Sequence, residues 1–311
     1  SGQCKNVIIL TGAGISTSAG IPDFRSPDTG LYANFDKFGV PSSDAMFDID
    51  YFRINPKAFY SICKSFMDVL KQATPTLSHY FLKLLAEKNI LLRLYTQNID
   101  GMEREVGIDP KYIIEAHGSL SISSCINCRA KIDIELFKNS VLANTILYCS
   151  ACNGLVKPDV VFFGERLPDY FFDSVEHDCK NCDLLIVSGT SLHVYPISLI
   201  VQLIPPDVPR LLINDVVIEP FIENSSTHGS ETSSIVDKKE ACDTLTIIEN
   251  PVDKISLHDD ATNETPECME LTTYDRDVVW VGNTDDGFRE LATYLGWNEE
   301  LQTIMDQANL T

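Results

Sequence analysis

The chain has 311 residues, of which 44% are hydrophobic and 9% aromatic, and its formal net charge is −21 at pH 7. This is the composition of a globular protein, and its acidity argues against non-specific nucleic-acid binding, which depends on lysine and arginine. No apolar run approaches the length of a membrane span, and no charged-then-apolar leader is visible at the start. Ten cysteines, four of them in two CxxC pairs with metal spacing, favour a reducing compartment and bound metal over a disulfide scaffold.

An apolar run at residues 7–10 predicts a buried strand, and the small residues after it predict a sharp turn into a helix. Because Gly12 and Gly14 lack side chains, we expect backbone N–H groups to approach a phosphate while the helix directs its positive end at the same charge. A Gly-x-Gly turn alone fits a plain strand-to-helix connection equally well. The stretch Asp23-Phe24-Arg25 follows a proline and so begins a loop, which departs from the layout of a hydride-transferring dehydrogenase.

Two stretches with apolar residues at helical spacing, 56–70 and 75–88, predict amphipathic helices. A second strand at 90–95 opens into the polar stretch Thr96-Gln97-Asn98-Ile99-Asp100-Gly101, and a short helix is expected at 102–106. Polar residues at the carboxyl end of a strand in an open α/β sheet lie where such folds bind ligands. A hydrogen-bonded turn that begins the next helix explains them equally well.

His117 lies at the end of another predicted strand, beside Gly118. A lone histidine is more often a packed or surface side chain than a catalytic one. Its place just before a metal motif makes it a candidate for catalysis.

Two cysteine pairs, Cys125-x2-Cys128 and Cys149-x2-Cys152, are separated by twenty residues and fit the spacing of a four-thiolate zinc ribbon. Four thiolates fill the coordination of a tetrahedral zinc and leave no position for a substrate water, so the metal is predicted to be structural. A third pair, Cys179 and Cys182, has no second pair at ribbon distance and is interpreted as a surface turn.

Strand and helix patterns alternate through the remaining ordered part. An apolar run at 155–166 is either a core strand or the wall of an apolar slot, and a buried strand at 183–192 ends in Gly-Thr-Ser. A helix at 196–204, strands at 210–214 and 276–282, and a final helix at 286–297 follow. This alternation predicts an α/β fold with a parallel sheet. Between the strands at 210–214 and 276–282, residues 219–273 carry thirteen acidic residues and three lysines, which predicts a mobile insertion.

Several of these stretches together resemble one family. GAGIS, PDFRSP, TQNID, EAHG, the two cysteine pairs, KPDVVFFGE, GTSL and LLIN occur in the order found in sirtuins, the Sir2-type NAD-dependent protein deacylases. The resemblance covers residues 6–214 and 276–301. It looks closest to class I, and within it to the cytosolic, tubulin-deacetylating sirtuin-two branch.

The resemblance implies a Rossmann-like NAD-binding domain with helices on both faces of a parallel sheet, formed by residues 1–40, 88–118 and 157–311. It implies a small helical and zinc-binding module formed by 41–87 and 119–156. The implied activity is NAD-dependent removal of acetyl groups from protein lysines, which gives nicotinamide and O-acetyl-ADP-ribose, with longer apolar acyl groups left open. One structural zinc would be held by Cys125, Cys128, Cys149 and Cys152.

Site residues are carried over on the matching motifs. The implied catalytic residues are His117, as general base on a ribose hydroxyl, and Asn98; an imidazole with a pKa of about 6.5 suits that task near neutral pH. Val161, Phe162, Phe163, Gly164 and Glu165 would bind the acyl-lysine. The implied NAD-binding residues are Gly12, Ala13, Gly14, Ile15, Ser16, Thr17, Asp23, Phe24, Arg25, Gln97, Asn98, Ile99, Asp100, His117, Gly189, Thr190, Ser191, Asn214, Asp215, Val216 and Thr284.

The chain departs from the family at Asp215-Val216, where relatives commonly have Lys-Glu, and in the acidic insertion. The resemblance further implies acetylated partner proteins such as histones or tubulin, no membrane or direct nucleic-acid partner, and a cytoplasmic location with the nucleus left open. Two alternatives remain: mono-ADP-ribosyl transfer to proteins by the same NAD chemistry, and a non-catalytic NAD-binding or zinc-ribbon interaction module.

Overall fold

The computed structural model describes residues 4–23, 30, 32–221 and 276–308. The predictions for Phe24 and Arg25, and for the acidic segment from residue 222 to residue 273, lie outside the described residues. None of the helices in the described ranges has both the length and the apolar character needed to cross a membrane.

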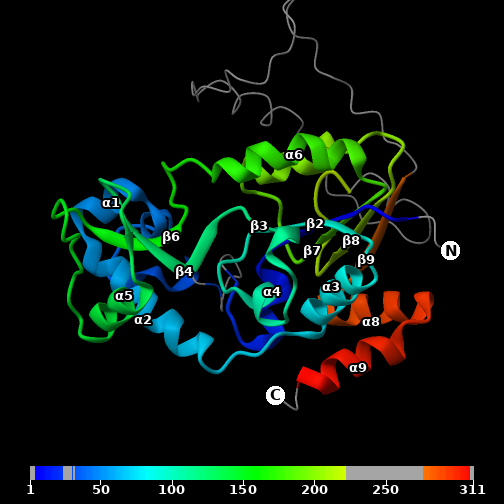
Figure 1. The fold of residues 1–311 in the computed structure, drawn as a ribbon, viewed down its shortest axis with the longest axis horizontal. Helices are drawn as coiled ribbons and strands as arrows, with labels where there is room; N and C mark the ends of the chain where they lie inside the picture. Colours follow the sequence, from blue (N-terminus) through cyan, green and yellow to red (C-terminus); the bar gives the residue numbers. More distant parts are fainter. Residues whose placement is uncertain (1–3, 24–29, 31, 222–275, 309–311) are drawn as a thin grey trace, which may run out of the picture. The chain divides into compact units, whose positions relative to one another are not determined.

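A six-stranded parallel sheet forms the centre of the fold, in the order β3-β2-β1-β7-β8-β9 (Figure 1). Its strands are β1 (Val7–Thr11), β2 (Leu91–Thr96), β3 (Ile113–Glu115), β7 (Leu184–Ser188), β8 (Arg210–Asn214) and β9 (Asp277–Val281). The chain builds outward from β1 through β2 to β3 and later returns to the other side of β1 with β7. The gap between the carboxyl ends of β1 and β7 is therefore a topological switch point, where open α/β sheets bind ligands.

Side chains of β1 alternate between two hydrophobic cores. Val7 and Ile9 pack with one set of helices, whereas Ile8 and Leu10 pack with another, and all four are buried. Figure 1 shows α3, α8 and α9 on one face of the sheet and α6 on the opposite face. The helices around the sheet are α3 (Leu77–Glu87), α4 (Met102–Glu105), α6 (Asp169–Asn181), α7 (Ile200–Leu203), α8 (Thr284–Leu295) and α9 (Asn298–Ala308). The sequence-based prediction of an α/β fold with a parallel sheet is confirmed.

A second, smaller sheet has the order β5-β4-β6 and is antiparallel. It consists of β4 (Gly118–Cys125), β5 (Lys131–Ile132) and β6 (Val156–Val160), and α1 (Ile49–Ile54), α2 (Pro56–Leu70) and α5 (Ile134–Leu142) accompany it. Its core contains edge-to-face contacts of Phe162 with Phe52 and Phe59, at ring-centroid distances of 5.7 and 4.7 Å. Proline at the first position of α2 suits a helix start, as predicted from the sequence.

The proposed domain boundaries do not coincide with these two sheets. Helix α3 belongs to the core of the parallel sheet, and β6 pairs with β4 in the small sheet. The division at 41–87 and 119–156 stays a proposal, and this packing favours placing α3 with the parallel sheet and β6 with the small one.

The α-helix that the sequence predicted after Gly12 is not formed. Two three-residue 3-10 turns, Ala13–Ile15 and Thr17–Ala19, occupy this segment instead. The carbonyl of Gly14 accepts hydrogen bonds from the hydroxyls of Thr17, at 3.0 Å, and Thr284, at 3.2 Å. Side-chain hydroxyls thus take a backbone acceptor that a continuing α-helix would use.

The third cysteine pair does not form the surface turn that the sequence predicted. Cys179 lies in the last turn of α6, and both Cys179 and Cys182 are buried against the parallel sheet. The pair was predicted to form a surface turn because helix α6 was missed: its sequence is rich in polar residues, and only its buried face, which includes Phe171, marks it as a core element.

Candidate active site and cysteine cluster

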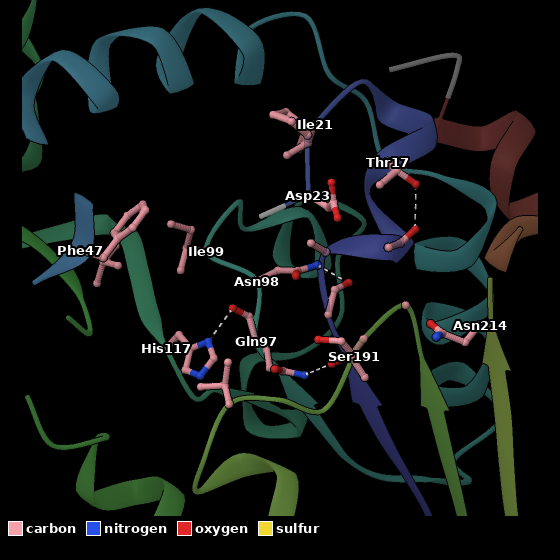
Figure 2. A pocket seen from close by; sticks show the side chains of 18 of the residues that line it. Thr17, Ile21, Asp23, Phe47, Gln97, Asn98, Ile99, His117, Ser191 and Asn214 are labelled. Carbon is pink, nitrogen blue, oxygen red and sulfur yellow. Dashed lines mark hydrogen bonds between the residues drawn. The ribbon is translucent and has the colours of Figure 1, made fainter. Parts of the chain in front are cut away.

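A cavity of about 1090 Å³ opens at the switch point of the parallel sheet and extends to the small sheet (Figure 2). It is larger than the range of about 300–1,000 Å³ typical of a pocket for one small molecule. Figure 2 shows Phe47 and Ile99 at one end of the cavity and Asn214 at the other. Its predicted lining residues are Gly12, Ala13, Gly14, Thr17, Asp23, Gln97, Asn98, Ile99, His117, Val161, Phe162, Phe163, Gly164, Glu165, Gly189, Thr190, Ser191, Asn214, Asp215, Val216 and Thr284.

Gly12 and Gly14 line the cavity and lie against the loop that follows β7. Their N–H groups donate to the carbonyls of Ser188, at 3.1 Å, and Gly189, at 2.8 Å, so they face the neighbouring loop. A Cβ atom on Gly14 would lie 2.6 Å from Gly189 Cα. The glycines therefore permit the loops after β1 and β7 to touch at the floor of the cavity, and any N–H groups that approach a phosphate there come from other residues of the turn.

Residues of the loop after β1 orient the side-chain amide of Asn98. Its Nδ2 donates to the Gly12 carbonyl and to Ser16 Oγ, both at 3.2 Å, and Ser16 Oγ in turn donates to Asp100 Oδ2 at 2.8 Å. Because both donor contacts of Asn98 are directed to the protein, the amide oxygen is the atom available to the cavity. Ser16, Asp100 and the buried Ile15 do not themselves line the cavity.

The ring of His117 is held through Gln97. His117 Nδ1 lies 3.1 Å from the Gln97 carbonyl oxygen, which can only accept, so the proton is on Nδ1 and the lone pair on Nε2 (Figure 2). The side-chain amide of Gln97 donates to Thr190 Oγ1 at 2.8 Å and to the Thr11 carbonyl at 3.2 Å. The ends of β1, β2 and β7 together thus fix the imidazole as a base.

Gly118 allows the chain to leave His117 in the required direction. It has a φ of +73°, and a Cβ atom there would lie 1.8 Å from the Asp159 carbonyl oxygen. The His117 carbonyl accepts the Val161 N–H at 2.8 Å. The histidine and the apolar segment after β6 are therefore joined directly.

That apolar segment forms the other wall. Phe162 is 1% exposed and belongs to the aromatic core of the small sheet, whereas Phe163 is 42% exposed at the cavity. Buried Lys157 donates to Glu165 Oε2 at 2.8 Å and to the Val160 carbonyl at 2.6 Å, and its ammonium lies 4.4 Å from the centroid of Phe162. Burial lowers the pKa of Lys157, an effect that the charge of Glu165 opposes.

The far end of the cavity comes from β8 and the start of α8. Asn214 Nδ2 donates to the Val216 carbonyl at 2.9 Å, while Asp215 and Val216 are exposed. Thr284 is buried and reaches the Gly14 carbonyl.

Several lining residues were not predicted from the sequence: Gly20, Ile21, Pro22, Phe47, Val160, Leu167, Val194, Tyr195, Gly282 and Asn283. Most of them adjoin predicted residues, so extending each motif by a few positions would have found them. Phe47 carries no such signal, because it precedes α1 and reaches the cavity only through the packing of the small sheet.

The four predicted zinc cysteines lie together. Their sulfur atoms are all within 4.8 Å of one another, with 3.4 Å between Cys125 and Cys152 and 3.7 Å between Cys128 and Cys149. Four sulfurs at about 2.3 Å from a tetrahedral zinc are about 3.8 Å apart, so this donor set fits the ion. Each pair is followed by a residue in the left-handed region, Arg129 (φ +60°) or Asn153 (φ +58°), which gives two turns of the same form.

The parallel sheet with a cavity at its switch point, and the ribbon with four thiolates, define a nucleotide-binding α/β protein with a structural metal site. The sequence model of the Sir2 family matches residues 12–196. The chain is 40% identical to the NAD-dependent protein deacetylase sirtuin-2 of Danio rerio over 98% of its length and 72% of that protein. It is 35% identical to the NAD-dependent protein deacetylase hst2 of Schizosaccharomyces pombe over 98% of its length and 76% of that protein. It is also 48% identical to the NAD-dependent deacetylase sir2A of Dictyostelium discoideum, over 69% of its length and 42% of that protein. The chain belongs to the Sir2 family.

Proposed function

We propose that the protein is an NAD-dependent protein-lysine deacetylase that holds one structural zinc. The observation that carries this proposal is His117, whose Nδ1 proton is directed to Gln97, in a cavity that has a polar end and an apolar end. The names of the relatives from three organisms support the same activity.

The residues that line the cavity suit NAD at one end and an acyl-lysine at the other. Thr17, Gln97, Asn98, Ser191 and Asn214 offer hydroxyl and amide oxygens, which can accept hydrogen bonds from ribose hydroxyls. When bound, NAD supplies the ribose that receives the acyl group and releases nicotinamide. Apolar walls accept a neutral acetamide more readily than a charged lysine, because an unpaired charge is costly to bury.

In this proposal His117 acts as the general base. Its Nε2 accepts the proton of a ribose hydroxyl, and the Gln97 carbonyl stabilises the imidazolium that results. Asn98 orients the nicotinamide end through its amide oxygen. Val161 and Phe163 confine the acyl-lysine side chain, and longer apolar acyl groups remain within the proposal.

Histones and tubulin are the protein substrates that we propose, and the cytoplasm, with the nucleus as a second site, is the proposed location. None of the described cysteines, among them buried Cys63, forms a disulfide, which fits a reducing compartment.

Incubation of the protein with NAD and acetyl-lysine peptides from histones and tubulin, followed by mass spectrometry, tests the proposal. We expect the peptide to lose its acetyl group and nicotinamide to be released. Gain of an ADP-ribosyl group would instead support the transferase alternative, and absence of nicotinamide release would support a non-catalytic module. A panel of acyl chain lengths in the same assay defines the acyl preference.

A further inference from the structure

Behind the floor of the cavity lies a second group of titratable side chains, His79, Asp100 and Glu103. One polar atom from each lies within 4.8 Å of the others. His79 is 0% exposed and Glu103 is 2% exposed, and neither lines the cavity. His79 Nε2 and Glu103 Oε1 are buried and have no hydrogen-bond partner among the described residues. Buried polar atoms without a hydrogen-bond partner reduce the stability of the folded state, so these two require an explanation.

The position of the proton on His79 follows from its place in α3. The backbone N–H of Thr76 donates to His79 Nδ1 at 3.2 Å, as in a capping box at the start of the helix. Thr76 Oγ1 also lies 2.8 Å from Nδ1. With Nδ1 accepting from the backbone N–H, a neutral imidazole carries its proton on Nε2. A metal ion would need the Nε2 lone pair, so this hydrogen bond favours shared protons over a bound cation.

Asp100 accepts hydrogen bonds on both carboxylate oxygens, whereas Glu103 accepts one from the Thr96 side chain and leaves its Oε1 without a donor. Ser16 Oγ donates to Asp100 Oδ2 at 2.8 Å, and the Met102 N–H donates to Asp100 Oδ1 at 3.0 Å. Glu103 has an oxygen without a donor, and burial, followed by the charge of Asp100, raises its pKa to about 8. At neutral pH Glu103 is thus a neutral acid that can donate, beside a carboxylate that can accept.

We propose that His79 and Glu103 are positioning residues: Glu103 donates its proton to the Asp100 carboxylate, His79 packs a neutral ring beside the two acids, and through Ser16 this group fixes the Asn98 amide at the cofactor cavity. This inference rests on the proposed function. Asn98 Nδ2 donates to Ser16 Oγ, and Ser16 Oγ donates to Asp100 Oδ2. The single hydroxyl proton of Ser16 is therefore directed to Asp100, and the Ser16 oxygen is left to accept from Asn98. The same end of α3 also grips the loop after β1, because Thr76 Oγ1 donates to the Ile15 carbonyl at 2.8 Å.

Three substitutions test the role of neutral donors. Glu103→Leu removes the donor, Glu103→Gln keeps a neutral donor of the same shape, and Glu105→Leu is the control, since Glu105 is exposed on the same helix α4. NAD binding is measured by calorimetry without acyl substrate, beside kcat and KM for NAD. We expect Glu103→Leu to weaken NAD binding at least tenfold, while Glu103→Gln stays within about twofold of the wild type and Glu105→Leu does not differ from it.

The pH profile supplies a readout that a purely structural role would not move. The charged or titratable groups around Glu103 are Asp100 after β2, His79 on α3, Glu115 on β3 and, beyond His79, Asp285 on α8. Above about pH 8 Glu103 loses its proton and repels Asp100, so the KM for NAD of the wild type should rise between pH 7 and pH 9. In Glu103→Gln that rise should disappear, because no proton can be lost.

The tautomer of His79 can be read by nitrogen NMR without NAD. His79→Gln, which preserves the capping box, assigns the signal. We expect a proton on Nε2 that persists through neutral pH, because burial lowers the pKa of His79.

Equal NAD affinity in Glu103→Leu and wild type, an unchanged pH profile in Glu103→Gln, or a proton on His79 Nδ1 would each overturn the proposal. Should Glu103→Leu fail to fold, the Glu103→Gln profile and the His79 signal still decide. A wild-type protein that neither binds NAD nor releases nicotinamide would instead contradict the proposed function, whatever the variants show.

Discussion

The cysteine cluster and the cavity are assembled from the chain in opposite ways. The cluster consists of two short turns, and each turn contains its own backbone hydrogen bonds, such as those from Arg129 N–H to the Cys125 carbonyl and from Asn153 N–H to the Cys149 carbonyl. The cavity instead collects residues from the carboxyl ends of the six strands of the parallel sheet, from Gly12 to Thr284. A site built from two turns depends on the ion that joins them, whereas a site built from strand ends depends on the sheet.

This contrast leads to a separation of effects. Loss of the metal should damage the fold of the small sheet, and loss of a polar group at the cavity should damage chemistry alone. Four substitutions, at Cys149, His117, Lys157 and Arg129, test that separation.

Replacement of Cys149 by serine should have the largest effect. Structural zinc contributes about 10–16 kcal/mol of binding free energy that is coupled to folding, so a lost ligand should release the ion and unfold the small sheet. Metal analysis and thermal unfolding measure this, with Cys4→Ser as a control outside the cluster. A chelator that strips zinc and leaves Tm unchanged would count against a structural metal.

Replacement of His117 by alanine should abolish deacetylation and leave the fold intact. A general base typically contributes about 10²–10⁴-fold to the rate, and no other described side chain of the cavity is an imidazole. Deacetylation of an acetyl-lysine peptide and Tm are compared with those of His193→Ala, which changes an exposed histidine. Turnover retained by His117→Ala would refute the assignment.

Replacement of Lys157 by methionine should destabilise the protein by about 3–5 kcal/mol. It removes the buried cation of the largely buried Glu165 carboxylate and leaves only the exposed Arg129, at 3.9 Å, to balance that charge. Urea unfolding measures the loss. The double variant Lys157→Met, Glu165→Gln removes both charges and should recover part of the stability; if it is no more stable than the single variant, the unpaired charge is not the cause.

Replacement of Arg129 by alanine should have the smallest effect, about 0–1 kcal/mol. The Arg129 side chain is 75% exposed and lies 3.9 Å from Glu165, so water screens the pair. A matched change, Arg166→Ala, alters another exposed arginine nearby. If Arg129→Ala instead slows deacetylation strongly, the cluster and the cavity are coupled and the separation is wrong.

Local patterns were sufficient for much of the molecule. The strand 210–214 and the helix 56–70 have the predicted bounds, and the cysteine spacing predicted the cluster. Each depends on residues that are close in sequence: β-branched runs form strands, helical spacing of apolar residues forms amphipathic helices, and two thiolate pairs suffice for zinc.

Other features could not be predicted because they depend on contacts between distant segments. The N–H groups of Gly12 and Gly14 face the end of β7 and the loop after it, about 175 residues away along the chain. Parallel strands that are neighbours in a sheet can be far apart in sequence, because a crossover connection joins them. Helix α6 was not predicted because most of its residues are polar, and only its packing against the sheet buries the few that are not.

Sequence alone was enough to predict the succession of strands along the chain, the grouping of four cysteines and the polar residues at the strand ends. Tertiary structure decided which of those polar residues reach the cavity: His117 and Asn98 do, while Asp100 turns to Ser16 and the buried group behind it. The physical reason is that a side chain's chemistry is local, but its hydrogen-bond partner and its burial depend on which distant segments pack beside it.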